Sequence, residues 1–204
     1  MLSPFLLMSQ TFVRNSDEKK FDSVAVYGKE KFKDIEEVKL EYEDLKNKKN
    51  KTFNSKELKN NFCVIFRNQK LATLIKIDAQ KKVFIKSVVF FPDTRFLAHD
   101  IKGNIDIEVL PNVNGFPDID NPILSFKRDI SETVQKKWEI ILPKIIKYPE
   151  NGFFITFDYQ SNDQGKTSQL KMNKNTAMYF YYPQSDQWKK LNINGYLYIV
   201  KFLQ

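Results

Sequence analysis

The chain of 204 residues has one cysteine, one histidine and six glycines, and each shortage excludes a class of chemistry. A single Cys63 cannot form an internal disulfide bond. Together with His99 it cannot supply the four nitrogen or sulfur ligands of a usual zinc site. Six glycines leave neither a glycine-rich phosphate loop nor a dinucleotide-binding fingerprint. We therefore expect no zinc centre and no nucleotide chemistry.

Catalytic residue sets are equally scarce. His99 precedes Asp100, but the chain has no G-x-S-x-G nucleophile motif, so we interpret His99 as an ordinary loop residue. Cys63 lies in the apolar run NFCVIF and is interpreted as a small buried hydrophobe. Asp106 and Glu108 alternate along one predicted strand and would suit a glycosidase, yet the same alternation is typical of the wet side of a half-buried strand. The sequence favours a protein that is not an enzyme.

No stretch approaches the roughly 20 apolar residues of a membrane-spanning helix, so we expect no membrane span. At the N-terminus, the apolar run Phe5–Met8 precedes Ser9 and Gln10 and is typical of the second half of a secretory signal. We interpret residues 1–9 as a partial signal peptide whose start codon lies upstream. The alternative is a short apolar strand or leader of a cytosolic protein. Export to the periplasm, the outer-membrane surface or the medium is expected.

The net charge is +8, but positive charge is not concentrated along the chain. A nucleic-acid-binding protein needs clustered lysine and arginine, because phosphate contacts act through local release of counterions. Arginines are few and far apart, and the one basic run, KNKKNK at Lys46–Lys51, is typical of a solvated loop. We expect no nucleic-acid partner.

Hydrophobic residues make up 42% of the chain, with 18 phenylalanines and nine tyrosines, which is enough to build a core. From Asn61 onward, short apolar runs alternate with turn-forming pairs such as Asn151-Gly152 and Asn194-Gly195. No helical pattern of 10 to 15 residues separates them, so we predict an all-β antiparallel sandwich. The ten predicted strands are 61–67, 71–78, 82–91, 104–110, 123–130, 137–142, 152–159, 169–173, 177–182 and 195–203.

Residues 10–60 differ in having dense mixed charge and few long apolar runs, so we predict a short charged N-terminal appendage, or a strand and linker. Within it, residues 34–48 fit both a helix and a strand, with a preference for the strand. The polar stretch 47–61 is predicted to be a connection with one helical turn at 55–58. The sandwich domain is then expected over residues 61–204.

One set of residues between about residue 61 and residue 160 follows a known pattern: Pro117, Asp118, Trp138, Pro149, Asn151, Gly152, Phe153 and Phe154. With these residues the region resembles a jelly-roll-like β-sandwich domain of exported Gram-negative envelope proteins, which often accompanies carboxypeptidase-regulatory-like domains. The sequence departs from that pattern at Leu142-Pro143 and at Asp158-Tyr159. The family has no catalytic residues to carry over, so the resemblance implies a jelly-roll-like fold and export only.

The loop PNVNGFPDIDN is rich in the oxygen ligands that calcium prefers. It lacks the regular spacing of a calcium-binding loop, so a plain turn-rich loop is the alternative. If this loop does not bind calcium, we expect the protein to have no cofactor. The candidate ligands are Asn112, Asn114, Asp118, Asp120 and Asn121.

Aromatic residues crowd the C-terminal part of the chain and have two possible roles. They can fill the core and pair across strands, or they can form a stacking platform for sugar rings. Tyr182 and Trp188 flank the PQSDQ turn and are the candidates for an exposed platform. We expect a non-catalytic exported envelope module that contacts an envelope protein or a surface glycan, with a carbohydrate-binding module as the alternative.

Overall fold

The computed structural model of the protein describes residues 45–78, 82–93, 101–160 and 167–204. The partial signal peptide, His99 and most of the ambiguous segment 34–48 lie outside the described residues.

In the described part, the chain forms 12 strands and one short 3₁₀ helix, η2 (Ile130–Val134). All strand ladders are antiparallel, which confirms the predicted all-β sandwich. Among these residues, no helix has the length and apolar character needed to cross a membrane. The strands are β1 (Asn50–Asn54), β2 (Glu57–Val64), β3 (Lys70–Ile75), β4 (Phe84–Phe90), β5 (Asn104–Val113), β6 (Phe116–Pro117), β7 (Leu124–Asp129), β8 (Trp138–Lys147), β9 (Phe153–Tyr159), β10 (Gln169–Tyr182), β11 (Gln187–Tyr196) and β12 (Tyr198–Leu203).

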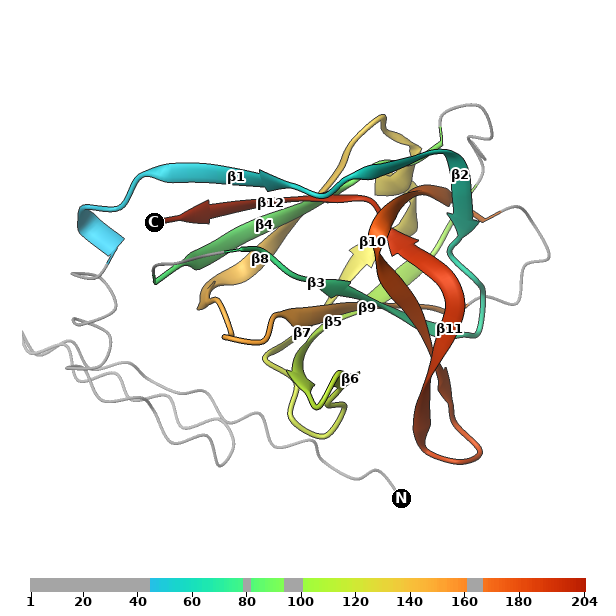
Figure 1. Cartoon of the computed structure of the whole chain (residues 1–204). Coiled ribbons are helices and arrows are strands. Elements are labelled where there is room, and N and C mark those ends of the chain that lie inside the picture. Colours follow the sequence, from blue (N-terminus) through green and yellow to red (C-terminus); the bar gives the residue numbers. More distant parts are fainter. Residues whose placement is uncertain (1–44, 79–81, 94–100, 161–166) are drawn as a thin grey trace, which may run out of the picture. The chain divides into compact units, whose positions relative to one another are not determined.

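The strands form two sheets (Figure 1). The smaller has the order β1-β12-β4-β8. The larger has the order β11-β10-β3-β9-β5-β6, with β2 added on β10 and β7 added on β5. Neighbours in space are far apart in sequence, as when β3 pairs with β9 and β1 pairs with β12. The topology therefore depends on long-range pairing.

The main core lies between the two sheets and follows from alternation along the strands. In β5, Ile105, Ile107 and Val109 are fully buried, whereas Asp106 and Glu108 project to the opposite face, as predicted. Aromatic rings fill the centre, where Phe90 contacts Trp138, Phe157 and Tyr196 with ring centroids 5.1 to 6.3 Å apart. The main core is therefore formed by one face of each sheet, and the opposite face of the larger sheet does not belong to it.

The predicted packing residues of the Trp138–Tyr159 stretch are confirmed, with one difference. Trp138 and Phe153 belong to the main core. Phe154 is also fully buried, but it belongs to a second, smaller cluster with Ala72, Leu110 and Tyr179. Because successive strand residues point to opposite faces, adjacent phenylalanines serve two clusters on the two sides of one sheet.

The N-terminal boundary predicted between residues 60 and 61 falls inside β2. The predicted connection over 47–61, including its helical turn at 55–58, is instead formed mainly by strands β1 and β2. β1 pairs with β12 and β2 pairs with β10, so residues 50–60 belong to the two sheets. Both strands are largely exposed, so their sequence lacks the apolar pattern on which the prediction depended.

Two further predictions at the C-terminal end were wrong. The predicted strands 169–173 and 177–182 are one 14-residue strand, β10, whose pairing with β11 is irregular near Ala177. β11 was not predicted, and Asn194-Gly195, expected to form a turn, lies within it. β11 is an edge strand with a mostly exposed, polar sequence, and its backbone pairing with β10 determines its conformation.

Two buried tyrosines hold the chain where β3 ends. The Tyr198 hydroxyl accepts a hydrogen bond from Lys76 N at 3.0 Å and donates one to Lys76 O at 2.9 Å. The Tyr148 hydroxyl makes the same pair of bonds with Ile77, at 2.9 and 3.2 Å. Burial is the main cause that raises the pKa of Tyr198 to about 12. Both hydroxyls thus satisfy backbone groups that no strand ladder reaches.

Candidate functional site

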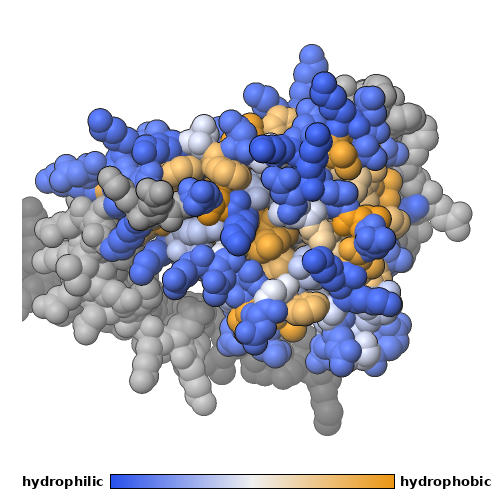
Figure 2. Space-filling view, viewed as in Figure 1, coloured by the Kyte–Doolittle hydropathy of each residue, from blue (hydrophilic) through white to orange (hydrophobic). Residues whose placement is uncertain are grey.

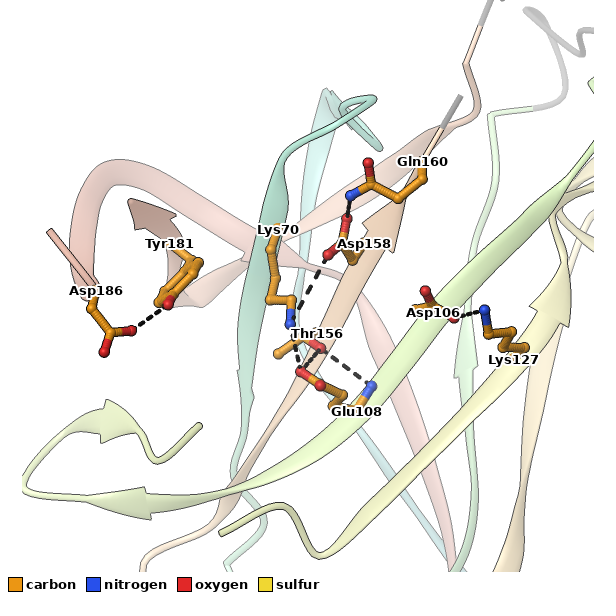
Figure 3. A network of polar contacts seen from close by, with 9 residues as sticks. All are labelled: Lys70, Asp106, Glu108, Lys127, Thr156, Asp158, Gln160, Tyr181 and Asp186. Carbon is orange, nitrogen blue, oxygen red and sulfur yellow. Dashed lines mark hydrogen bonds and ion pairs between the residues drawn. The ribbon is translucent and has the colours of Figure 1, made fainter. Parts of the chain in front are cut away.

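The face of the larger sheet that points away from the main core, called here the outer face, carries a row of charges across four strands. Lys70 on β3 pairs in register with Asp158 on β9, Asp158 with Asp106 on β5, and Asp106 with Lys127 on β7. The order across the sheet is therefore positive, negative, negative, positive (Figure 3). Two carboxylates stand directly opposite each other, and each has a lysine on its far side.

Lys70 is the centre of this network. Its Nζ lies 3.0 Å from Glu108 Oε2 and 4.0 Å from Asp158 Oδ2, and all three side chains are about one fifth exposed. The Thr156 hydroxyl donates to Glu108 Oε2 at 3.3 Å, and Gln160 Nε2 donates to Asp158 Oδ1. The carboxylates of β5 and β9 are thus fixed in position and keep one edge open to solvent.

Next to the charged row lies a pair of aromatic side chains, Tyr181 on β10 and Trp188 on β11, which are directly opposite each other in the ladder. Their ring centroids are 5.3 Å apart and the rings are inclined at 51°. Lys70 Nζ lies 6.0 Å from the centroid of the Tyr181 ring, which joins the aromatic pair to the charges. The Tyr181 hydroxyl donates a hydrogen bond to Asp186 Oδ1 in the hairpin turn (Figure 3).

Trp188 also has a polar side-chain atom that lacks a hydrogen-bond partner within the described residues. Its Nε1 is buried, and within the described part of the chain it has no hydrogen-bond acceptor. A buried donor that lacks an acceptor costs about 1–3 kcal/mol. The aromatic pair therefore contains a hydrogen-bond donor that the described residues leave unsatisfied.

Beneath the aromatic pair, the second cluster provides an apolar base for the site. Tyr179 packs edge-on against Phe154 and Phe116, with centroids 4.9 and 5.8 Å apart. Phe116 and Val113 at the β5–β6 turn are 45% and 48% exposed. In Figure 2, hydrophilic residues cover most of the visible face, and hydrophobic ones show through over β3 and around this turn. The site therefore combines fixed charges with apolar surface.

The Tyr181 hydroxyl is influenced by several carboxylates. The hydrogen bond to Asp186 is the largest cause that raises the pKa of Tyr181, followed by burial and by the charges of Asp186, Asp120 and Glu108. These carboxylates come from β5, the loop after β6 and the β10–β11 turn, and Lys70 lies on the face of the same ring.

The two predicted platform residues do not form one surface. Trp188 packs against Tyr181 on the outer face. Tyr182, 38% exposed, packs instead against Phe180, with centroids 4.5 Å apart. Because Tyr181 and Tyr182 are neighbours in a strand, they point to opposite faces. Tyr181 was not singled out from the sequence. The signal for it is the number of residues across the PQSDQ turn, because this spacing places Tyr181 opposite Trp188 in the hairpin.

Two of the calcium candidates, Asn112 and Asp118, use their side-chain oxygens in turn hydrogen bonds. Asn112 Oδ1 accepts from Gly115 N at 3.0 Å, and Asn112 Nδ2 donates to Asn151 O at 2.7 Å. The two carboxylate oxygens of Asp118 accept from Asp120 N and Asn121 Nδ2, at 3.2 and 3.0 Å. Asn114 occupies the turn with a positive φ of 52°. Within the described residues, no three acidic, histidine or cysteine side chains group as metal ligands.

The outer surface of the smaller sheet has two shallow depressions. Their volumes are about 400 and 570 Å³, and Thr52, Glu139 and Lys201 line both. Glu139 accepts hydrogen bonds from Lys201 Nζ at 2.7 Å and from Ser87 Oγ at 2.6 Å, and these bonds lower its pKa. Of the charged residues that line this surface, Glu139 and Lys201 form an ion pair, and Lys51 and Lys86 donate to the neutral side chains of Gln204 and Asn50.

Cys63 is partly buried, and burial is the main cause that raises the pKa of its thiol.

Comparisons with known proteins assign this chain to no family. No family model matches the sequence, and no curated protein matches it. The chain is similar in structure to the cysteine protease and lectin-like domains of Cwp84, a surface layer associated protein of Clostridium difficile, with 12% identity and a TM-score of 0.44. The match covers 66% of this chain and 32% of that chain, so this chain spans about a third of its neighbour's length. At this level the likeness carries no inference about a ligand.

Proposed function

We propose that the protein is a non-catalytic glycan-binding module of the cell envelope, with its binding surface at Tyr181 and Trp188 on the outer face. The observation that carries the proposal is the Tyr181–Trp188 aromatic pair, with ring centroids 5.3 Å apart, beside the fixed carboxylates of the outer face. An envelope location is supported by the resemblance to domains of exported Gram-negative envelope proteins and by the apolar N-terminus.

Sugars present the chemistry that such a surface complements. A pyranose ring has an apolar face of C–H groups, which packs against an aromatic ring, and a rim of hydroxyls, which donate and accept hydrogen bonds. Tyr181 and Trp188 offer the apolar contact. Asp186 and Glu108 can accept hydrogen bonds from sugar hydroxyls. Since the rings are inclined at 51°, one ring stacks on the sugar and the other closes its edge.

The charged row supports binding better than hydrolysis. A glycosidase needs one carboxyl group that carries a proton and one that does not. Lys70 Nζ contacts both Glu108 and Asp158, so these two carboxylates share one environment and lack the unlike surroundings of a glycosidase pair. Asp106 is likewise paired with Lys127 at 3.3 Å. The three carboxylates on β5 and β9 therefore suit hydrogen-bond acceptors.

A protein partner is the second candidate, on the grounds that Val113 and Phe116 expose nearly half of their side chains at the β5–β6 turn. Exposed apolar residues at a turn are suited to a contact with another envelope protein. In that case, replacing both residues by serine would weaken capture of the partner without affecting sugar binding.

A glycan array probed with the full chain tests the first proposal. We expect binding to be lost in Tyr181→Ala and in Trp188→Ala and retained in Tyr182→Ala. The last variant is a matched control because it removes an exposed tyrosine one position away, on the opposite face of β10. Urea unfolding of each variant separates loss of binding from loss of fold. An array without hits, or hits that survive both substitutions, would refute the proposal.

A further inference from the structure

The basic run of the sequence, Lys46–Lys51, lies at the edge of the smaller sheet. The run ends in β1, an edge strand of that sheet, which pairs with β12 (Figure 1). Its Lys51 lines the larger of the two depressions on this sheet, of about 570 Å³, together with Lys86 from β4 and Lys201 from β12. Lysines far apart in the sequence therefore meet on one surface.

This depression has an excess of positive charge. Three lysines line it and one carboxylate, that of Glu139, so three positive charges stand against one negative charge and the balance is +2. Glu139 is paired with Lys201, whose Nζ lies 2.7 Å from Glu139 Oε2. Lys51 and Lys86 instead donate to amide oxygens of neutral side chains, at 2.9 and 3.0 Å. Within the described residues, neither of these two lysines forms an ion pair.

A further lysine of the basic run is held nearby by Phe84. This residue precedes Lys86 by two positions on β4 and is only 6% exposed, yet it belongs to neither apolar cluster. Lys48 and Lys82 cover its ring, with Nζ atoms 5.2 and 5.4 Å from the centroid. A lysine over an aromatic ring is held by the attraction between its charge and the ring. The charge of Lys48 therefore adds to the positive potential beside the depression.

We propose that this surface is a second binding site, which takes an acidic glycan and binds a uronate carboxylate at Lys51 and Lys86. An ammonium group has three donors, and one donor of each lysine is used by an amide, so N–H groups remain for an anion. Hydrogen bonds between two charged groups are also stronger than those to a neutral amide. The volume of about 570 Å³ lies within the range of about 300–1,000 Å³ that is typical of ligand sites.

The smaller depression favours a glycan over other polyanions. It has a volume of about 400 Å³ and shares Thr52, Glu139 and Lys201 with the larger one. Its charges balance, since Lys137 and Lys201 are matched by Glu132 and Glu139, and hydroxyl and amide side chains also line it. A nucleic acid carries a phosphate on every unit and needs positive charge along its whole length. A glycan in which uronic acids alternate with neutral sugars suits both depressions.

Calorimetric titration of the full chain with a hexasaccharide of hyaluronan, in which glucuronic acid alternates with N-acetylglucosamine, tests the proposal. We expect binding at low salt that weakens as salt is added, because exposed charges are screened. Tyr181→Ala should leave this binding unchanged, since Tyr181 belongs to the larger sheet. A thymidine hexanucleotide and phosphatidylglycerol vesicles are the competing polyanions and should bind more weakly or not at all.

The variant Lys51→Gln/Lys86→Gln should weaken hyaluronan binding about five- to tenfold, because it removes both charges and keeps side chains that can donate hydrogen bonds. Lys59→Gln/Lys102→Gln is the matched control. It removes two exposed lysines that line neither depression and lowers the net charge equally, so binding should stay unchanged. Urea unfolding midpoints show whether each variant keeps the fold.

Several results would overturn the acidic-glycan site. They are no binding of the hexasaccharide, equal affinities of the lysine variant and the wild type, or an equal loss in the control variant. Tighter binding of the hexanucleotide, or binding to the vesicles without binding to the hexasaccharide, would assign the surface to another partner. Loss of hyaluronan binding in Tyr181→Ala would place the ligand at the aromatic pair instead. The neutral glycans of the array test that pair separately, so either site can fail while the other stands.

Discussion

Replacing Lys70 with methionine should destabilise the fold, because the Lys70 ammonium group offsets the negative charges of Glu108 on β5 and Asp158 on β9. Asp158 and Asp106 are directly opposite each other on β9 and β5, and Glu108 follows two residues later on β5. Like charges directly opposite in a sheet are destabilising. Without Lys70, only Lys127 would offset them, and Lys127 is 70% exposed and reaches Asp106 alone.

The magnitude follows from the burial of the pair. Exposed ion pairs contribute about 0.2–1 kcal/mol, and removing one partner of a fully buried pair costs about 3–5 kcal/mol. The side chains of Lys70, Glu108 and Asp158 are 17%, 22% and 20% exposed, which places them between these limits. Methionine keeps most of the apolar stem of lysine, so the loss is mainly electrostatic. We expect a loss of about 2 kcal/mol in the free energy of unfolding.

Urea unfolding at neutral pH measures this loss, which corresponds to a fall of about 1 M in the midpoint. Lys144→Met is the control, since Lys144 is exposed on β8, and its effect should stay within about 0.5 kcal/mol. Adding Asp158→Asn to Lys70→Met should recover part of the loss, because it removes the charge opposite Asp106. Equal midpoints for Lys70→Met and the control, or no recovery in the double variant, would refute this account.

Three further substitutions test the fold. Tyr198→Phe should cost about 1 kcal/mol in urea unfolding, because it removes the partner of the Lys76 N–H and C=O, whose hydrogen bonds are partly buried. Gly152→Ala should destabilise by at least about 1 kcal/mol in the same assay, since φ is +84° and a Cβ would lie 2.7 Å from Ile75 O. The pKa of Glu139 is lowered in the folded state, chiefly by Lys201, so its contribution is present above the unfolded pKa, ordinarily near 4.5, and is lost as pH falls through the folded pKa. Glu139→Gln should therefore be less stable than the wild type at pH 7 and equally stable in acid; a difference that persists in acid would contradict this origin.

Alternation along single strands predicted much of the sandwich. Ile105, Ile107 and Val109 point inward while Asp106 and Glu108 point outward, as their spacing indicates, because the period of a strand is a local property of the backbone. The strands missed were β1, β6 and β11, which are short or mostly exposed. Such strands form because a neighbour supplies their hydrogen bonds, and the local sequence does not contain that information.

The candidate site was less predictable for the same reason. Trp188 was identified from the sequence, but its partner was expected to be Tyr182, and the ladder places Tyr181 opposite Trp188 instead. A shift of one residue in register moves a side chain to the other face of the sheet. The register of a hairpin must therefore be known before its aromatic residues can be assigned to a surface.

The sequence by itself determined that this protein is built of short antiparallel strands and which residues of β5 point away from the core. Only the tertiary structure decided that Lys70, Glu108 and Asp158, from three strands far apart in the chain, form one charged network beside Tyr181 and Trp188. The physical reason is that strand periodicity arises from the local backbone, whereas the order and register of strands arise from packing and hydrogen bonding across the whole sheet.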